Sequence, residues 1–218
     1  TEMAQRMGVH GRRLHVLVSD YWARPLTLQL TGSNFKDDEI ETVLKSQYRR
    51  QFAESMDDWT WCWERQGAQL SAVAWPKRGL KLLRQDLKAR NCILASALPL
   101  SIDVAKQMVT VGDSTWLAIV EIASVTLVRQ QKDGWGRWLV IPADRVVVEN
   151  LDVQLTREAV RCEDECRRVM VVKLGGDADM SVCHKGLMQA GWSIKVCSPS
   201  SAQESRGYFL SRSIATAQ

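Results

Sequence analysis

The chain has 218 residues, of which 45% are hydrophobic and 25% are charged, the composition of a globular protein with a sizeable core. Its formal net charge is only +4, so the strong basic excess of a nucleic-acid binder is missing, and nucleic acid is not expected as a partner. No run approaches the roughly 20 apolar residues that span a bilayer. We therefore expect a cytoplasmic protein whose six cysteines stay reduced.

The first half of the chain alternates strand and helix signals. Short apolar or alternating runs predict strands, and acidic residues ahead of an apolar stripe at helical spacing predict a helix. Pro76 ends one strand and begins a helix. The expected strands are 14–18, 26–30, 59–65, 69–75 and 92–98, and the expected helices begin near residues 37, 76 and 101.

Three tryptophans, Trp59, Trp61 and Trp63, occupy every second position of one predicted strand. Side chains alternate between the faces of a strand, so the three indoles share one face. Each indole has a large apolar surface and a single N–H donor. This face is expected to pack against the core or against a partner.

The second half repeats the order of elements after a joint at 111–114. Both halves run strands, helix, strand, helix, which predicts an α/β protein made of two tandem units with mixed sheets flanked by helices. The expected strands are 116–122, 125–131, 135–141, 169–174 and 192–197, and the expected helices are 150–165 and 181–190. The predicted organisation is a disordered or appended tail at 1–12, subdomains at 13–110 and 111–198, and a polar tail at 199–218.

Metal binding has one candidate set. Cys162 and Cys166 have the i, i+4 spacing of one face of the predicted helix, which begins near residue 150, and Cys183 and His184 follow. Structural zinc sites use paired short-spaced knuckles, and no second knuckle is present. We therefore favour ordinary thiols, and no metal is expected. No cysteine–histidine catalytic pair is expected either, because the chain has only three histidines.

Partner binding has candidates of two kinds. Trp135 and Trp138 flank a hairpin turn and are difficult to bury together, and Arg49 and Arg50 lie beside the apolar stripe of the first helix. A basic cluster at 77–90 has helical spacing. The favoured interpretation of that cluster is a solvated helix face, and the alternative is contact with an acidic partner or a membrane surface.

The run Leu14-His15-Val16-Leu17-Val18-Ser19-Asp20-Tyr21-Trp22-Ala23-Arg24 resembles the first hairpin of degenerate actin-like (ribonuclease-H-like) proteins of bacterial pilus and secretion machines. The relatives are the cytoplasmic L component of type II secretion and the M component of type IV pilus assembly. The strand order of the second half is similar to the second actin-like subdomain. Gly175-Gly176 falls where the family's adenosine loop would lie, although a simple strand–helix turn is the favoured interpretation.

The two phosphate loops that the resemblance implies depart from the family pattern. The first reads Ser19-Asp20-Tyr21-Trp22 and the second Glu121-Ile122-Ala123-Ser124, and neither contains the glycine that lets a backbone approach a phosphate. ATP hydrolysis is therefore not expected, and no cofactor is expected. Asp20, Gly175 and Gly176 are the only candidates for cofactor binding.

The resemblance implies a non-catalytic cytoplasmic scaffold, peripheral to the inner membrane. Its partners would be an assembly ATPase, the cytosolic tail of an inner-membrane platform protein, or both, with membrane contact only through them. A second copy of this chain, forming a homodimer, is a further candidate partner. The alternatives are a nucleotide-binding actin-like protein of the same machinery, which would use Asp20 and Gly175-Gly176, and an unrelated small α/β enzyme.

Overall fold

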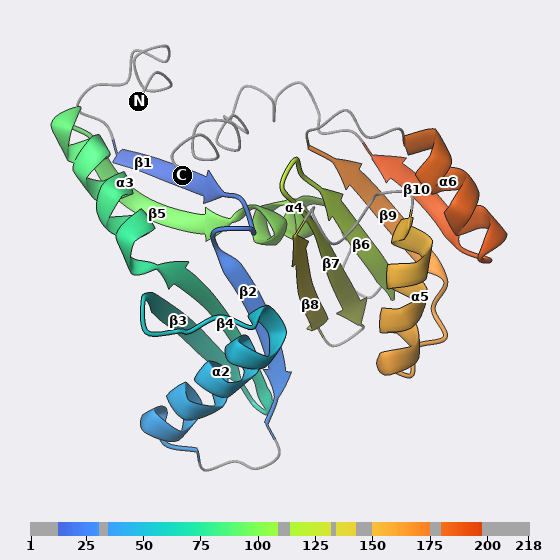
Figure 1. The fold of residues 1–218 in the computed structure, drawn as a ribbon, viewed down its shortest axis with the longest axis horizontal. Coiled ribbons are helices and arrows are strands. Elements are labelled where there is room, and N and C mark those ends of the chain that lie inside the picture. The colour runs from blue at the N-terminus through green and yellow to red at the C-terminus, as the bar shows by residue number, and fades with distance from the viewer. Residues whose placement is uncertain are drawn as a thin grey trace. The chain divides into compact units, whose positions relative to one another are not determined.

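The computed structural model describes residues 13–30, 35–108, 114–131, 134–142, 150–174 and 180–197. Groups of one to three consecutive strands are separated by single helices (Figure 1). In chain order the elements are β1 (Arg13–Val18), β2 (Arg24–Gln29), α2 (Asp37–Phe52), β3 (Trp59–Gln66), β4 (Gln69–Pro76), α3 (Lys77–Ala89), β5 (Ile93–Pro99), α4 (Leu100–Met108), β6 (Thr115–Val120), β7 (Ser124–Gln131), β8 (Gly134–Pro142), α5 (Leu151–Arg161), β9 (Arg168–Lys173), α6 (Met180–Gln189) and β10 (Ser193–Cys197).

Contacts between residues divide the chain into two compact units. Among the described residues, the first unit contains 13–16 and 22–97, and the second contains 17–21 and 98–197. Each unit has its own sheets and its own buried side chains, and the two are described separately. The subdomain boundaries expected from the sequence stay a prediction.

The first unit is built on an antiparallel sheet with the strand order β2-β4-β3. The predicted hairpin is confirmed, since β3 pairs with β4 from Trp59 opposite Pro76 to Gln66 opposite Gln69. Helix α2 packs on this sheet, and the Trp61 ring stacks on the ring of Tyr48 from α2, with 6.1 Å between their centroids. The tryptophan face of β3 is therefore in contact with α2.

Arg24 connects the same elements through its charge and its flat guanidinium group. The guanidinium carbon lies 4.4 Å from the ring centroid of Phe52 and 4.3 Å from that of Trp59, and Glu54 accepts two hydrogen bonds from it, at 2.9 and 3.2 Å. The Tyr48 hydroxyl donates to the main-chain oxygen of Arg24 at 3.0 Å. A cation that is 8% exposed is thus paired with a carboxylate and stacked on two rings.

The hairpin expected at 14–24 is wrong, because β1 pairs with β5 and β2 pairs with β4. Strand β2 is an edge strand, and this position tolerates Pro25, which has no N–H to donate. Leu26 on β2 is buried and pairs with Ala72 of β4. Because pairing with β4 buries this apolar face, β2 pairs with β4 and not with β1, the strand before it in the sequence.

The second unit has one mixed sheet with the strand order β10-β9-β6-β7-β8. The predicted meander β6–β7–β8 is antiparallel, and β9 and β10 add in parallel. All six residues of β6 are buried, as expected for a central strand with both faces covered. On one face the sheet packs against Leu151, Leu155 and Ala159 of α5 and against Cys183 and Leu187 of α6. On the other face it packs against Leu100, Val104 and Ala105 of α4. The predicted fold class, α/β with mixed sheets flanked by helices, is confirmed.

Helix α5 ends at Arg161, four residues earlier than predicted. Glu163 has a left-handed φ of 50°, which turns the chain out of the helix. Asp164 then accepts hydrogen bonds from Trp116 Nε1 at 2.8 Å and from Arg129 Nη2 at 2.9 Å. The Asp164 carboxylate is bound by buried donors of the sheet. The chain must leave the helical path before Asp164 to make these contacts.

Candidate functional site

The two turns that the resemblance equates with phosphate loops meet in the second unit. Asp20 follows β1 and Glu121 follows β6. The main-chain N–H of Asp20 donates to Oε2 of Glu121 at 3.3 Å. Both carboxyl groups are buried, with 0% of Asp20 and 7% of Glu121 exposed. The sequence places these residues 101 positions apart, and the fold makes them a carboxyl pair.

Hydroxyl and amide groups surround the carboxyl pair. The main-chain N–H of Ser101, in the first turn of α4, donates to Oδ1 of Asp20 at 3.2 Å. The Ser124 hydroxyl donates to Oε2 of Glu121 at 3.1 Å. Trp138 Nε1 donates to the Ser101 hydroxyl at 3.0 Å, which orients that residue. The pair therefore links the β1–β2 turn to α4 and to the β6–β7 turn.

The pKa values of both carboxyl groups are raised. Burial, followed by the charge of Glu121, raises the pKa of Asp20 to about 8, against lowering contributions from Ser101 and Thr126. Burial also raises the pKa of Glu121, and hydrogen bonds from Ser19, Ser124 and the Asp20 backbone oppose that rise. Two adjacent buried carboxylates cannot both ionise cheaply. At neutral pH the raised pKa values favour a carboxyl pair that shares one proton.

Two polar atoms of this cluster lack a hydrogen bond. Within the described residues, Oδ2 of Asp20 and the hydroxyl oxygen of Thr126 have no hydrogen-bond partner. The Thr126 hydroxyl lies near enough to lower the pKa of Asp20, but not in hydrogen-bond geometry. A proton on Oδ2 of Asp20 would make this buried atom a hydrogen-bond donor, and the raised pKa of Asp20 favours such a proton.

The two turns do not fit a triphosphate with its metal ion. A phosphate loop offers main-chain N–H groups beside glycine, and its carboxylates are ionised toward the cation. Here the turns carry Tyr21 and Ile122 in place of glycine, the Asp20 N–H is directed at Glu121, and the pair holds a proton. The local arrangement favours holding the turns together over receiving an anion.

The other residues considered for nucleotide or metal binding do not form a site within the described part of the chain. Gly175 and Gly176 lie outside the described residues. Cys183 is buried in the core, where burial and the charge of Asp152 raise its thiol pKa to about 11. The expected i, i+4 placement of Cys162 and Cys166 on one helix is wrong, because α5 ends before Cys162. Nowhere in the described ranges do three or more His, Cys, Asp or Glu residues form a group that could hold a metal ion, and His184 belongs to none.

The candidate partner-binding residues differ in accessibility. Arg49 and Arg50 are exposed in the last turn of α2, where the helix dipole favours cations. Trp135 is half-buried against the second unit's core, and Trp138 is buried within it at 5% exposure. Their ring centroids are 5.4 Å apart. Trp138 therefore serves packing and the Ser101 hydrogen bond, whereas the two arginines are accessible to a partner.

The sequence singled out Asp20 and Glu121 as departures from a loop pattern, but it did not identify the groups around them. Ser101, Ser124 and Thr126 are common residue types without motif spacing. Their roles follow from tertiary contacts, so no local signal could have found them.

No known protein family matches this sequence, and no curated protein resembles it closely enough to count as a match. Its backbone, however, is similar to that of a Bacteroides thetaiotaomicron protein of unknown function with an actin-like ATPase fold. That comparison gives a TM-score of 0.59 at 9% identity and covers 85% of this chain and 68% of the other. The fold is actin-like.

Two further structural similarities are to components of bacterial pilus and secretion systems. A chain of the PilM–PilN type IV pilus biogenesis complex aligns with a TM-score of 0.60 at 12% identity, over 90% of this chain and 72% of that one. The cytoplasmic domain of EpsL, an inner-membrane component of the type II secretion system of Vibrio cholerae, aligns with a TM-score of 0.51 at 12% identity, over 80% and 74%. Across the described residues, no helix has both the length and the apolarity needed to cross a membrane.

Proposed function

We propose that this actin-like protein is a non-catalytic scaffold of a type IV pilus or type II secretion assembly platform. It would bind an assembly ATPase, the cytosolic tail of an inner-membrane partner, or both. It would work in the cytoplasm, at the inner membrane, and contact the membrane only through these partners. The similarity to the PilM–PilN complex and to the EpsL cytoplasmic domain supports this choice of machinery.

The observation that carries the proposal is the buried contact between Asp20 and Glu121. In an actin-like fold these two turns are where a nucleotide phosphate would be expected. Here the main-chain N–H of Asp20 donates to Glu121 Oε2 at 3.3 Å, and burial raises the pKa of both carboxyl groups. A site arranged in this way supports a structural role better than a hydrolytic one.

The test is complex formation between purified proteins. The chain would be mixed separately with the assembly ATPase and with a soluble cytosolic tail of the membrane partner, and each mixture analysed by size-exclusion chromatography with light scattering. We expect a complex with at least one of them. Arg49→Glu/Arg50→Glu should weaken it, while Lys185→Glu/Lys195→Glu, with the same change in net charge, should not. Failure of the wild-type chain to bind either component would overturn the proposal.

A second candidate function is nucleotide binding, because the fold brings Asp20 and Glu121 together where the actin-like resemblance places the phosphate loops. Calorimetric titration with ATP and magnesium separates the two candidates. The scaffold proposal expects no heat of binding and an unchanged melting temperature. A saturable signal that Asp20→Asn abolishes would favour the nucleotide-binding alternative.

A further inference from the structure

Helix α3 of the first unit carries an unusual charge distribution. Six of the residues from 77 to 90 are cationic, namely Lys77, Arg78, Lys81, Arg84, Lys88 and Arg90. The only acidic residue in that range is Asp86, and Arg90 pairs with it at 3.6 Å. No acidic residue lies in the first turn, although the helix dipole favours anions there. The helix itself is therefore strongly positive, although the exposed Asp57 and Asp58 lie beside its first residue, Lys77, whose main-chain N–H donates to the main-chain oxygen of Asp58 at 2.8 Å.

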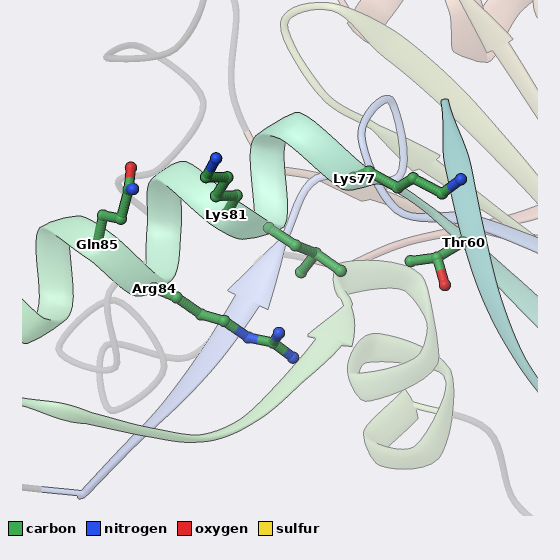
Figure 2. Close-up of a pocket in the computed structure, with 6 residues that line it drawn as sticks. Thr60, Lys77, Lys81, Arg84 and Gln85 are labelled. Carbon is green, nitrogen blue, oxygen red and sulfur yellow. The ribbon is translucent and has the colours of Figure 1, made fainter. Parts of the chain in front are cut away.

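A pocket of about 340 Å³ opens beside these cations. Helix α3 and the neighbouring strand β3 form it, and the Lys77 side chain extends from α3 toward Thr60 of β3 (Figure 2). Its lining residues are Thr60, Lys77, Leu80, Lys81, Arg84 and Gln85. Three cations, two neutral polar groups and one leucine form a surface suited to an anionic side chain with a small apolar neighbour.

Two of the three cations are available to such a group. Lys77 Nζ donates to the main-chain oxygen of Asp57 at 2.7 Å, so Lys77 is partly engaged. Lys81 and Arg84 are exposed, and neither forms an ion pair or hydrogen bond with any residue in the described part of the chain. Among the described residues their positive charge has no partner, so it is available to an external one.

We propose that the α3 pocket docks an acidic, extended segment of a protein partner. The inference rests on the proposed scaffold role and adds the chemistry of the segment. Lys77 and Lys81 lie four positions apart, about 6 Å along the helix axis, and Arg84 lies three positions further, about 4.5 Å. Alternate residues of an extended peptide are about 6.6 Å apart on one side. A segment with Glu or Asp at every second position therefore matches the spacing of Lys77 and Lys81.

A membrane surface fits this face less well. Helices that lie on a bilayer insert a broad apolar face, and Leu82, at 55% exposed, is the one large hydrophobic residue of α3 that is classed as exposed. A single leucine gives little area for insertion. The concave pocket with Thr60 and Gln85 on its wall suits a peptide side chain better than a flat array of headgroups.

The test uses the full chain and a fluorescein-labelled peptide with Glu at alternate positions, with a matched peptide in which Gln replaces each Glu. Fluorescence anisotropy should show saturable binding of the Glu peptide, weakened by salt, and no binding of the Gln peptide. Lys81→Glu/Arg84→Glu should reduce the affinity about tenfold or more. The control Lys185→Glu/Lys195→Glu changes net charge equally in the second unit and should have little effect. Thermal melts confirm that both variants fold.

Three results would overturn the proposal: equal binding of the Gln peptide, an equal loss in the control variant, or binding to phosphatidylserine vesicles that depends on Lys81 and Arg84 while the peptide does not bind. The scaffold role is tested separately. If the machine's proteins form a complex that Lys81→Glu/Arg84→Glu leaves intact and the peptide does not bind, this inference fails and the scaffold role survives. If the peptide binds at α3 but no complex forms, the scaffold role fails.

Discussion

The main-chain N–H of Asp20 donates a hydrogen bond to the carboxylate of Glu121 across 101 positions of sequence. This contact fastens the turn after β1 to the turn after β6 in a buried environment. It also makes the stability of the second unit depend on a proton, because two adjacent buried carboxyl groups cannot ionise together without cost.

Asp20 should make the protein less stable as pH rises. Its pKa rises from 3.8 to about 8 on folding, so between these values the native state binds more protons than the unfolded state. The free energy of unfolding should fall with pH in this window, by on the order of 1 kcal/mol per pH unit. The stabilisation from Asp20 is complete below pH 3.8 and is lost above about pH 8. The raised pKa of Glu121 changes stability in the same direction.

Asp20→Asn tests this effect, because the amide oxygen can still accept from Ser101 while the ionisation is removed. Urea unfolding at about pH 5 and about pH 8.5 should show a smaller fall in stability than in wild type. Glu64→Gln, at an exposed carboxylate of β3, should keep the wild-type slope. Parallel slopes for wild type and Asp20→Asn would contradict the assignment of the raised pKa to Asp20.

Asp164→Ala should be strongly destabilising. The change leaves Arg129, which is 4% exposed, without its carboxylate and removes the acceptor of Trp116 Nε1. Losing one partner of a buried ion pair typically costs about 3–5 kcal/mol. Glu165→Ala, at a neighbouring exposed acid, should cost less than about 0.5 kcal/mol. Denaturant midpoints of the two variants would be compared, and similar midpoints would show that the pair contributes little.

Leu155→Ala should open a cavity between α5 and the five-stranded sheet. Leu155 is completely buried in that core, and such truncations cost about 2–5 kcal/mol. Val153→Ala on the same helix is the matched control, because Val153 is 49% exposed and alanine favours helix. Calorimetric melting should show a large decrease for Leu155→Ala and almost none for Val153→Ala.

The cysteines should react in an order set by exposure and pKa. Cys62 is exposed on β3, whereas Cys183 is buried and its pKa is raised to about 11. At pH 8 only about one thousandth of such a thiol would be ionised. Alkylation followed by mass spectrometry should modify Cys62 first and Cys183 last, and Cys62→Ser should remove the fast phase. Early modification of Cys183 would show that α6 opens readily.

Local pattern predicted most elements of this fold. The tryptophan alternation at 59–63, the Pro76 boundary and the meander of β6, β7 and β8 all came from period and turn chemistry. The expected hairpin at 14–24 failed because pairing depends on which apolar faces are buried, and β2 buries Leu26 against β4. The end of α5 was missed because Asp164 is captured by Arg129, and no local periodicity contains that partner.

The candidate site was predictable in identity but not in arrangement. Asp20 and Glu121 were visible as departures from glycine-bearing loops, yet their contact, their burial and their raised pKa values required the fold. The basic residues of α3 were visible as a cluster with helical spacing. The pocket beside them depends on Thr60 from another element, so sequence alone favoured a solvated face.

Strand β6 lies at the centre of the five-stranded sheet with all six residues buried. Its amide hydrogens are shielded on both sides by neighbouring strands and on both faces by helices. In deuterium oxide they should exchange only when the whole unit opens, so their rates report the global free energy of that unit. Amides of β2, which lies at the edge of its sheet among the described strands, should exchange through local fraying, so one exchange experiment would give separate readings from the two units.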